Sequence, residues 1–185
     1  MGDEVARLFV AVPLTEEARS DIAHLVGRAA PRGLPGRPAH PDKWHLTLRF
    51  LGDVGAVSRD RVLAELDAAD PGPAFRVRWG GLGAFPNPRR ATVLWVGLEE
   101  GAAQLTAVAA VVEEAVEAAG FPPEDRPFRP HLTLSRIRPH QDVTALLDGC
   151  PSLGVAMPVD RVVLYRSRLG RGGARYEAIE EFPLA

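Results

Sequence analysis

One tetrapeptide, His-Leu-Thr-Leu, occurs twice in this 185-residue chain, at residues 45–48 and again at residues 131–134. The chain has five histidines, and two of them open these identical segments. A helical pattern and then a proline-rich stretch precede each copy. Because the motif recurs in the same context, we expect two related folding units that each present one copy of it.

The similarity between the two halves extends beyond the tetrapeptides. When His45 is placed on His131, two apolar segments of the first half fall on apolar segments of the second, 8–12 on 94–98 and 75–79 on 161–165. We therefore expect a single bilobal domain, residues 1–185, with an approximate internal repeat of residues 5–85 and 91–182.

Hydrophobic periodicity predicts the order of the elements. The expected strands are 5–12, 44–51, 75–85, 91–98, a strand at the second tetrapeptide, 155–168 and 174–182. The expected helices are 15–30, 58–68, 101–119 and 141–148, and the segments 31–43 and 121–130 are expected to be loops. This order predicts an α+β fold of two pseudo-symmetric lobes, each a mostly antiparallel sheet with helices on its outer face, enclosing a central cleft.

Composition limits the classes of partner. The net charge of −2 argues against a general nucleic-acid coat, but residues 126–175 contain nine arginines against three acidic residues. Such a segment can form a local phosphate-binding surface, or it can be a solvated arginine-rich face. Cys150 is the single cysteine, and the first residues match neither a secretory signal nor a membrane span. We therefore expect a cytoplasmic monomer with no membrane partner.

Each tetrapeptide predicts a polar and an apolar strand face, because side chains alternate along a strand. His45 and Thr47 then share one face, and the two leucines share the other and pack under the helices. His131 and Thr133 repeat this arrangement. If the lobes are related by a pseudo-twofold axis, both His/Thr pairs point into one groove. The alternative, that the histidine is a tolerated neighbour of a good strand sequence, does not account for the duplication.

Two histidines and two threonines fit phosphodiester cleavage. The imidazole pKa of about 6.5 lets one ring be neutral while the other is protonated near neutral pH. That pair can take a proton from water and give one to a leaving oxygen. Threonine hydroxyls can donate to the nonbridging oxygens of a phosphate, and Arg136 near the end of the second strand can strengthen that contact.

Other site classes lack their patterns. A catalytic zinc site needs three protein ligands, and the remaining histidines, His24, His40 and His140, lie at no recognisable ligand spacing. The Gly-x-Ser-x-Gly, Gly-x-Gly-x-x-Gly and P-loop patterns do not occur. We therefore expect no metal and no cofactor.

Several segments together resemble a known family. They are Arg-Leu-Phe-Val-Ala at 7–11, His-Leu-Thr-Leu-Arg-Phe-Leu-Gly at 45–52, Phe-Arg-Pro-His-Leu-Thr-Leu-Ser-Arg at 128–136, and Arg166, Ser167, Gly173 and Tyr176. As a set they resemble the bacterial and archaeal RNA 2′,3′-cyclic phosphodiesterases, also called 2′-5′ RNA ligases, of the two-histidine phosphoesterase superfamily. The resemblance covers nearly the whole chain.

The resemblance implies hydrolysis of an RNA 2′,3′-cyclic phosphate end to a 2′-phosphomonoester, without metal or nucleotide cofactor. It also implies the reverse reaction, which joins such an end to a 5′-hydroxyl through a 2′-5′ bond. His45, Thr47, His131 and Thr133 carry over as catalytic residues and Arg136 as a substrate contact. We assign His131 as the proton acceptor and His45 as the proton donor. Ser135 stands where relatives often have alanine, and no consequence is expected.

Base recognition is expected from aromatic residues on the presumed groove face. Phe9 and Trp95 occupy matching positions of the repeat, and either ring could stack on a nucleobase, as could Tyr176. The alternative is packing between neighbouring strands. The loops 31–43 and 121–130 could rim the cleft, where Arg37, Lys43, Arg126 and Arg129 would either meet flanking phosphates or be solvated.

Three functions remain open from the sequence. The first is the RNA cyclic phosphodiesterase, whose partner is an RNA with a 2′,3′-cyclic phosphate end, with tRNA fragments as one source. The second is a phosphodiesterase for a small cyclic nucleotide product. The third is a non-catalytic module that binds RNA ends.

Overall fold

The computed structural model describes residues 5–170 and 173–185. The strands are β1 (Ala6–Pro13), β2 (Arg37–Pro38), β3 (His45–Val54), β4 (Phe75–Phe85), β5 (Ala91–Glu100), β6 (Leu132–Gln141), β7 (Ala156–Val159), β8 (Arg161–Gly170) and β9 (Gly173–Pro183). The helices are α1 (Glu16–Ala29), α2 (Ala56–Ala68), α3 (Ala102–Ala118) and α4 (Thr144–Asp148), with short 3₁₀ turns η1 (Pro41–Lys43) and η2 (Pro88–Arg90).

The expected elements are present, with three differences in their bounds. The segment 31–43 is not entirely a loop, because β2 and η1 lie within it. The expected strand 155–168 is two strands, β7 and β8, separated at Asp160. The last helix starts at Thr144 and not at residue 141, because Gln141 still belongs to β6, where it pairs with Ala91.

The strands form one curled antiparallel sheet in the order β7-β4-β5-β6-β3-β1-β8-β9, and β2 pairs with β6 beside this path. The printed pairing between β3 and β6 is a single residue pair, Leu46 with Leu132. This narrow junction divides the sheet into two halves, β3-β1-β8-β9 and β6-β5-β4-β7. The two halves are the two lobes of the α+β fold that the sequence predicts.

Equivalent strands of the sequence repeat occupy equivalent places in the two half-sheets. However, each half-sheet contains strands from both repeat units, 5–85 and 91–182. Moving outward from the junction, β3, β1 and β8 in one half match β6, β5 and β4 in the other. The third strand of each unit therefore lies in the opposite half. For β4 the reason is its short connection to β5 through η2, since consecutive antiparallel strands joined by a short loop pair with each other.

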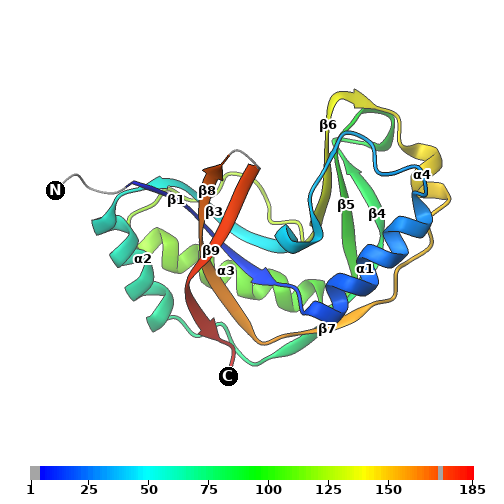
Figure 1. The fold of residues 1–185 in the computed structure, drawn as a ribbon. Coiled ribbons are helices and arrows are strands. Elements are labelled where there is room, and N and C mark those ends of the chain that lie inside the picture. The colour runs from blue at the N-terminus through cyan, green and yellow to red at the C-terminus, as the bar shows by residue number, and fades with distance from the viewer. Residues whose placement is uncertain (1–4, 171–172) are drawn as a thin grey trace.

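The helices lie along the outer side of the curled sheet (Figure 1). The Thr15 side chain caps α1 by accepting a 3.2 Å hydrogen bond from the Ala18 amide. Gly120, with φ of 98°, ends α3 and lets the Phe121 amide donate to the Val116 carbonyl. No helix in the described part of the chain is long and apolar enough to cross a membrane.

The core lies between the helices and the sheet. Its largest members include Ile22 of α1, Leu105 of α3, and the leucines that follow the two histidines, all 1% exposed or less. Burying each of these side chains stabilises the fold by about 1.5–3 kcal/mol. The two motif strands are therefore anchored from their apolar faces, which leaves their polar faces to build a site.

Candidate active site

The two histidines meet where the two half-sheets join. Leu46 and Leu132 pair across the junction, and each directly follows a histidine. Since the pair is antiparallel, the chain before Leu46 runs toward the chain after Leu132. Both histidines and both threonines of the tetrapeptides line one cleft of about 570 Å³. The structure therefore brings the two copies of the motif together in one cavity.

A β-bulge follows each His-x-Thr segment at the same position. On β3, Thr47 and Arg49 pair with adjacent residues of β1, which leaves Leu48 as the extra residue. On β6, Thr133 and Ser135 pair with adjacent residues of β5, which leaves Leu134 as the extra residue. A bulge shifts the alternation of side chains by one position.

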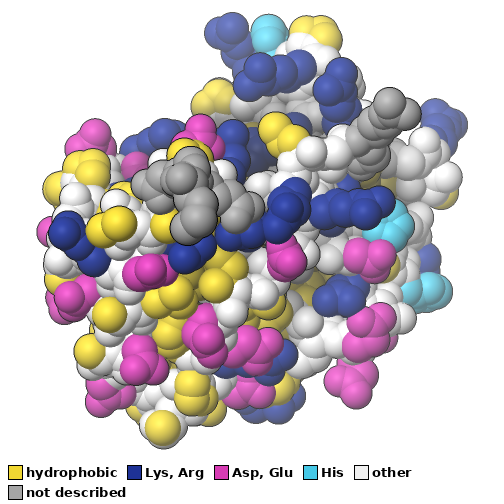
Figure 2. All heavy atoms as spheres, turned by 60° about the vertical axis from the view of Figure 1, so that its left-hand side comes forward, with side chains coloured by type: hydrophobic (Ala, Val, Ile, Leu, Met, Phe, Trp, Pro, Cys, Tyr) yellow, Lys and Arg dark blue, Asp and Glu magenta, His cyan; other side chains and the backbone are white. Residues whose placement is uncertain are grey.

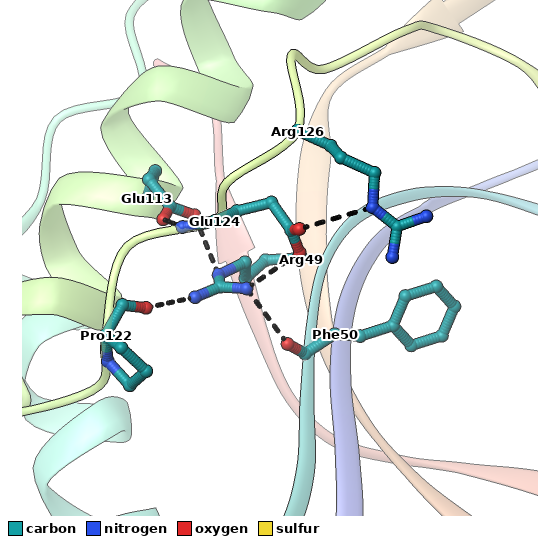
Figure 3. Close-up of polar contacts among 6 residues, drawn as sticks. All are labelled: Arg49, Phe50, Glu113, Pro122, Glu124 and Arg126. Atoms are coloured by element: carbon teal, nitrogen blue, oxygen red, sulfur yellow. Dashed lines mark hydrogen bonds and ion pairs between the residues drawn. The ribbon is translucent and has the colours of Figure 1, made fainter.

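The two bulges exchange the faces of the residues that follow them. Arg49 and Ser135, which strict alternation would place in the cleft, are buried instead, with exposed fractions of 9% and 0%. Phe50 and Arg136, the next residues, line the cleft; the buried Arg49 also borders it, and Ser135 does not. Figure 3 shows the Phe50 ring and the Arg49 guanidinium on opposite sides of the β3 ribbon.

Both imidazoles are held in the same way by the backbone two residues earlier. His45 Nδ1 lies 2.8 Å from the Lys43 carbonyl oxygen, and His131 Nδ1 lies 2.6 Å from the Arg129 carbonyl oxygen. A carbonyl can only accept, so each Nδ1 carries a proton and donates it. Each neutral ring therefore presents an unprotonated Nε2 that can accept a proton, and each charged ring presents an Nε2–H that can give one.

The environment lowers the pKa of both rings below the ordinary histidine value. Burial is the largest cause in each case, because it disfavours the charged ring, and the bond to the backbone carbonyl opposes it. The positive charge of His131 lowers the pKa of His45 further, and the positive charge of Arg136 lowers the pKa of His131 further.

The Phe9 ring packs against the His45 ring. Its ring centroid lies 4.8 Å from that of His45 and 5.2 Å from that of Tyr165. Phe9 borders the cleft, but its side chain is 3% exposed because its position in the sheet, between β3 and β8, surrounds the ring with neighbours. This burial favours packing over base contact for Phe9, and base contact stays a prediction.

Trp95 has the matching position beside His131, with the two ring centroids 6.3 Å apart. The indole lies directly over Gly83 of β4, where an added Cβ would come within 2.2 Å of ring atoms. Its other close neighbour is Phe85, at 5.1 Å. Trp95 is not among the residues that line the cleft, so packing describes it better than the expected base contact.

Of the aromatic side chains that line the cleft, Phe50 and Tyr176 are exposed, and Phe50 was missed from the sequence. Tyr176 is 38% exposed and meets the His45 ring edge-on at 5.2 Å. Phe50 is 56% exposed and lies 5.9 Å from Phe9. Simple alternation along β3 puts Phe50 on the core face with Leu46, which is why the sequence analysis overlooked it. The bulge at Leu48 carries no clear sequence signal.

Cationic side chains surround the histidines. Arg136, Lys43, Arg126 and Arg129 all line the cleft, whereas Arg37 pairs with β6 and is not among the lining residues. Figure 2 shows Lys and Arg side chains gathered on the upper part of one face, with most of the acidic side chains of that face below them. Within the described ranges, no group of three or more His, Cys, Asp or Glu side chains could hold a metal ion.

Comparison with known proteins agrees with this geometry. Residues 16–171 match the family model of the 2′-5′ RNA ligase superfamily. RNA 2′,3′-cyclic phosphodiesterase of Aeropyrum pernix is 34% identical over 171 residues, which cover 89% of this chain and 95% of the relative. The enzyme of the same name from Thermus thermophilus is 36% identical over 190 residues, which cover 96% and 90%.

A solved structure gives the same result over the full length. Escherichia coli LigT, crystallised in complex with 3′-AMP, superposes with a TM-score of 0.81 at 28% identity, and the match covers 98% of this chain and 99% of LigT. Two lobes that carry paired His-x-Thr motifs in one cleft thus coincide with sequence similarity along the whole chain. The protein belongs to the 2′-5′ RNA ligase superfamily and, within it, to the RNA 2′,3′-cyclic phosphodiesterase family.

Proposed function

We propose that this chain hydrolyses RNA 2′,3′-cyclic phosphate ends to 2′-phosphomonoesters by general acid–base catalysis between His45 and His131, without a metal ion. The observation that carries the proposal is the matched pair of imidazoles, each fixed through Nδ1 to a backbone carbonyl, in one cleft. Both proton transfers of the reaction then have a side chain to perform them.

In the proposed reaction, a water oxygen attacks the phosphorus opposite the 3′ oxygen. His131 Nε2 accepts the proton that the water loses, and His45 Nε2–H gives its proton to the 3′ oxygen as the P–O3′ bond breaks. The products are a 3′-hydroxyl and a 2′-phosphate, and the two rings have exchanged protonation states. We assign His131 as the base and His45 as the acid, as in the expectation from the sequence. The charge of Arg136 lowers the pKa of His131 and the charge of His131 lowers the pKa of His45, so experiment decides between this assignment and the reverse.

Thr47, Thr133 and Arg136 supply the donors for the phosphate. All three line the same cleft as the histidines. Negative charge grows on the nonbridging oxygens as the fifth bond to phosphorus forms, and fixed donors stabilise that charge without reorganisation. A 5′-hydroxyl can take the place of water, in which case the same groups would form a 2′-5′ bond.

Recognition of the last base is assigned to Phe50 and Tyr176. Both are exposed aromatic side chains at the cleft on the His45 side. The crystal structure of LigT in complex with 3′-AMP supports a nucleotide as the kind of ligand. The cationic side chains around the cleft suit the phosphates of a longer strand. A tRNA-fragment substrate, a monomeric state and a cytoplasmic location stay predictions.

The test uses purified protein, EDTA and an oligonucleotide that ends in a 2′,3′-cyclic phosphate. We expect a 2′-phosphate product, with His45→Ala and His131→Ala each reducing kcat by about 10²–10⁴-fold, the usual contribution of one acid or base. His140→Ala is the control, because His140 is exposed and is not among the cleft-lining residues. Full activity of either cleft variant, or loss of activity in EDTA, would contradict the proposal.

Comparing the oligonucleotide with a cyclic mononucleotide decides between the two substrate classes. If RNA is the substrate, the oligonucleotide has the lower KM, and its advantage shrinks as salt is added, since phosphate contacts are screened. Equal kcat/KM for both at low salt would favour a small cyclic nucleotide. Tight binding with no turnover would favour the RNA-end binding module.

A further inference from the structure

Among the described residues, two polar or charged side chains are buried, Arg49 and Ser135. They occupy the same position of the repeat, since each lies four residues after a motif histidine. The bulges at Leu48 and Leu134 bury both side chains, although Arg49 still borders the cleft. Burying a polar group costs free energy unless it is hydrogen-bonded, so the partners of these two side chains indicate what they do.

Arg49 ties three segments together (Figure 3). Its Nε lies 2.8 Å from a carboxylate oxygen of Glu113 on α3, and another guanidinium nitrogen lies 3.0 Å from Glu124 in the loop 121–130. The remaining guanidinium nitrogen donates to the Pro122 carbonyl of the same loop. Glu113 also accepts a 2.7 Å hydrogen bond from the Glu124 amide. The side chain of the first motif strand thus anchors the loop 121–130.

That loop leads directly to the other histidine. It ends at Pro130, and its Arg129 carbonyl accepts the proton of His131 Nδ1 at 2.6 Å. The segment from 121 to 130 forms no strand or helix, so no sheet pairing holds it. Several of its residues line the cleft, from Glu124 to Arg129. The position of the Arg129 carbonyl, and with it the tautomer of His131, therefore depends on side-chain anchors.

The reciprocal contact is made by the second motif strand. Ser135 Oγ donates to the carbonyl of Pro35, in the loop 31–43 that leads to His45. The same loop is held by backbone pairing, because Arg37 and Pro38 pair with β6 and the Ala39 amide donates to the Leu134 carbonyl at 2.8 Å.

We propose that each motif strand braces the loop that ends at the histidine of the other strand, and that Arg49 is the positioning residue for His131. The proposal rests on the proposed function for its catalytic meaning, because it assigns Arg49 to the orientation of the base. The guanidinium suits this role, since its planar set of donors reaches a carbonyl and two carboxylates at once. In this arrangement the orientation of one histidine depends on the strand that carries the other.

The test follows both rings separately by nitrogen-15 NMR of the histidine side chains. The variants are Arg49→Lys, which keeps the charge but loses the planar donor set, and Glu124→Ala, which removes one anchor of the loop and leaves the Arg49–Glu113 pair in place. In both, we expect His131 to lose its Nδ1–H tautomer while His45 keeps its own. We expect kcat to fall by about 10-fold to 100-fold with little change in KM, because misplacement of a catalytic group costs rate.

Two further variants complete the design. Ser135→Ala should change the tautomer of His45 and not that of His131, by a smaller amount because the backbone pairing of β2 remains. Glu100→Ala is the matched control, because it removes a carboxylate from an exposed ion pair with Arg78, 3.0 Å long and outside the cleft. It should leave both rings unchanged.

The proposal is overturned if Arg49→Lys and Glu124→Ala leave His131 unchanged, or if they alter both rings equally while lowering the melting temperature. The experiments that test this proposal differ from those that test the proposed function, so one can fail without the other. Full activity of His131→Ala would remove the catalytic role, whereas the tautomer measurement would still decide whether the brace exists.

Discussion

The two halves of the cleft share a framework and differ in what they add to it. Each half has a histidine fixed to a backbone carbonyl, a threonine two residues later, and a bulge before the next cleft-facing side chain. After the bulge, the His45 half presents the exposed ring of Phe50, and the His131 half presents the cation Arg136. Under the proposed function, the repeated part supplies the paired chemistry, and the divergent position would separate base contact from phosphate contact.

The loops of the two halves differ in the same way. The loop 31–43 is held mainly by backbone pairing with β6, whereas the loop 121–130 is held by the side chain of Arg49. Breaking a buried ion pair by removing one partner costs about 3–5 kcal/mol, and backbone pairing does not depend on one residue. The His131 half is therefore the one that a single substitution can loosen.

The largest expected difference between the halves concerns the leaving group. If the 3′ bridging oxygen of the cyclic phosphate is replaced by sulfur, the thiolate leaves without needing a proton. The loss in His45→Ala, about 10²–10⁴-fold on the oxygen substrate, should then be largely restored, and the loss in His131→Ala should persist. Single-turnover rates on the two substrates measure this. If the sulfur substrate restored the activity of His131→Ala and not that of His45→Ala, then His131 would be the acid and His45 the base.

A second comparison sets Arg136 against Phe50. Arg136→Met should lower kcat by about 10²–10³-fold, because it removes a donor to the charge of the transition state. Phe50→Ala should mainly raise KM, since base stacking contributes about 1–3 kcal/mol to binding. Measuring both variants on a cyclic ribose phosphate that lacks the base provides the control. The Phe50 effect should vanish there and the Arg136 effect should remain, and the reverse pattern would contradict the division of labour.

The smallest expected effect is on the pH profile. Because the pKa values of both histidines are lowered in the free enzyme, kcat/KM should be greatest below about pH 6.5, where one ring is protonated and the other is neutral. Arg136→Met removes a positive charge beside His131, which raises the pKa of that ring. The acidic limb should therefore move to higher pH. A shift of the acidic limb to lower pH would indicate that a residue other than His131 is the base.

Much of this fold could be predicted from the sequence. Hydrophobic periodicity located the helices, and Gly120 ended α3 where the sequence predicted it. The duplicated tetrapeptide predicted two lobes around one cleft, which the curled two-part sheet confirms. What periodicity could not predict is the exchange of β4 and β8 between the halves, because strand pairing depends on contacts between residues far apart in the chain.

The aromatic residues show where sequence reasoning failed. Phe9 and Trp95 were placed on the groove face, which is the correct face, but Phe9 is 3% exposed there and Trp95 lies over Gly83. Facing a groove is a property of one strand, whereas exposure depends on the neighbouring strands. Phe50 was missed for the related reason that a bulge is a property of two strands.

The sequence by itself determined which residues share a face, because alternation along a strand is local: each histidine lies with its threonine, and each leucine packs beneath. Only the tertiary structure decided that the two faces meet at the Leu46–Leu132 junction, that Arg49 is buried at the border of the cleft, and that Phe50 and Arg136 face it. Those outcomes depend on how strands pair with one another, and the sequence of one strand does not specify which strand it pairs with.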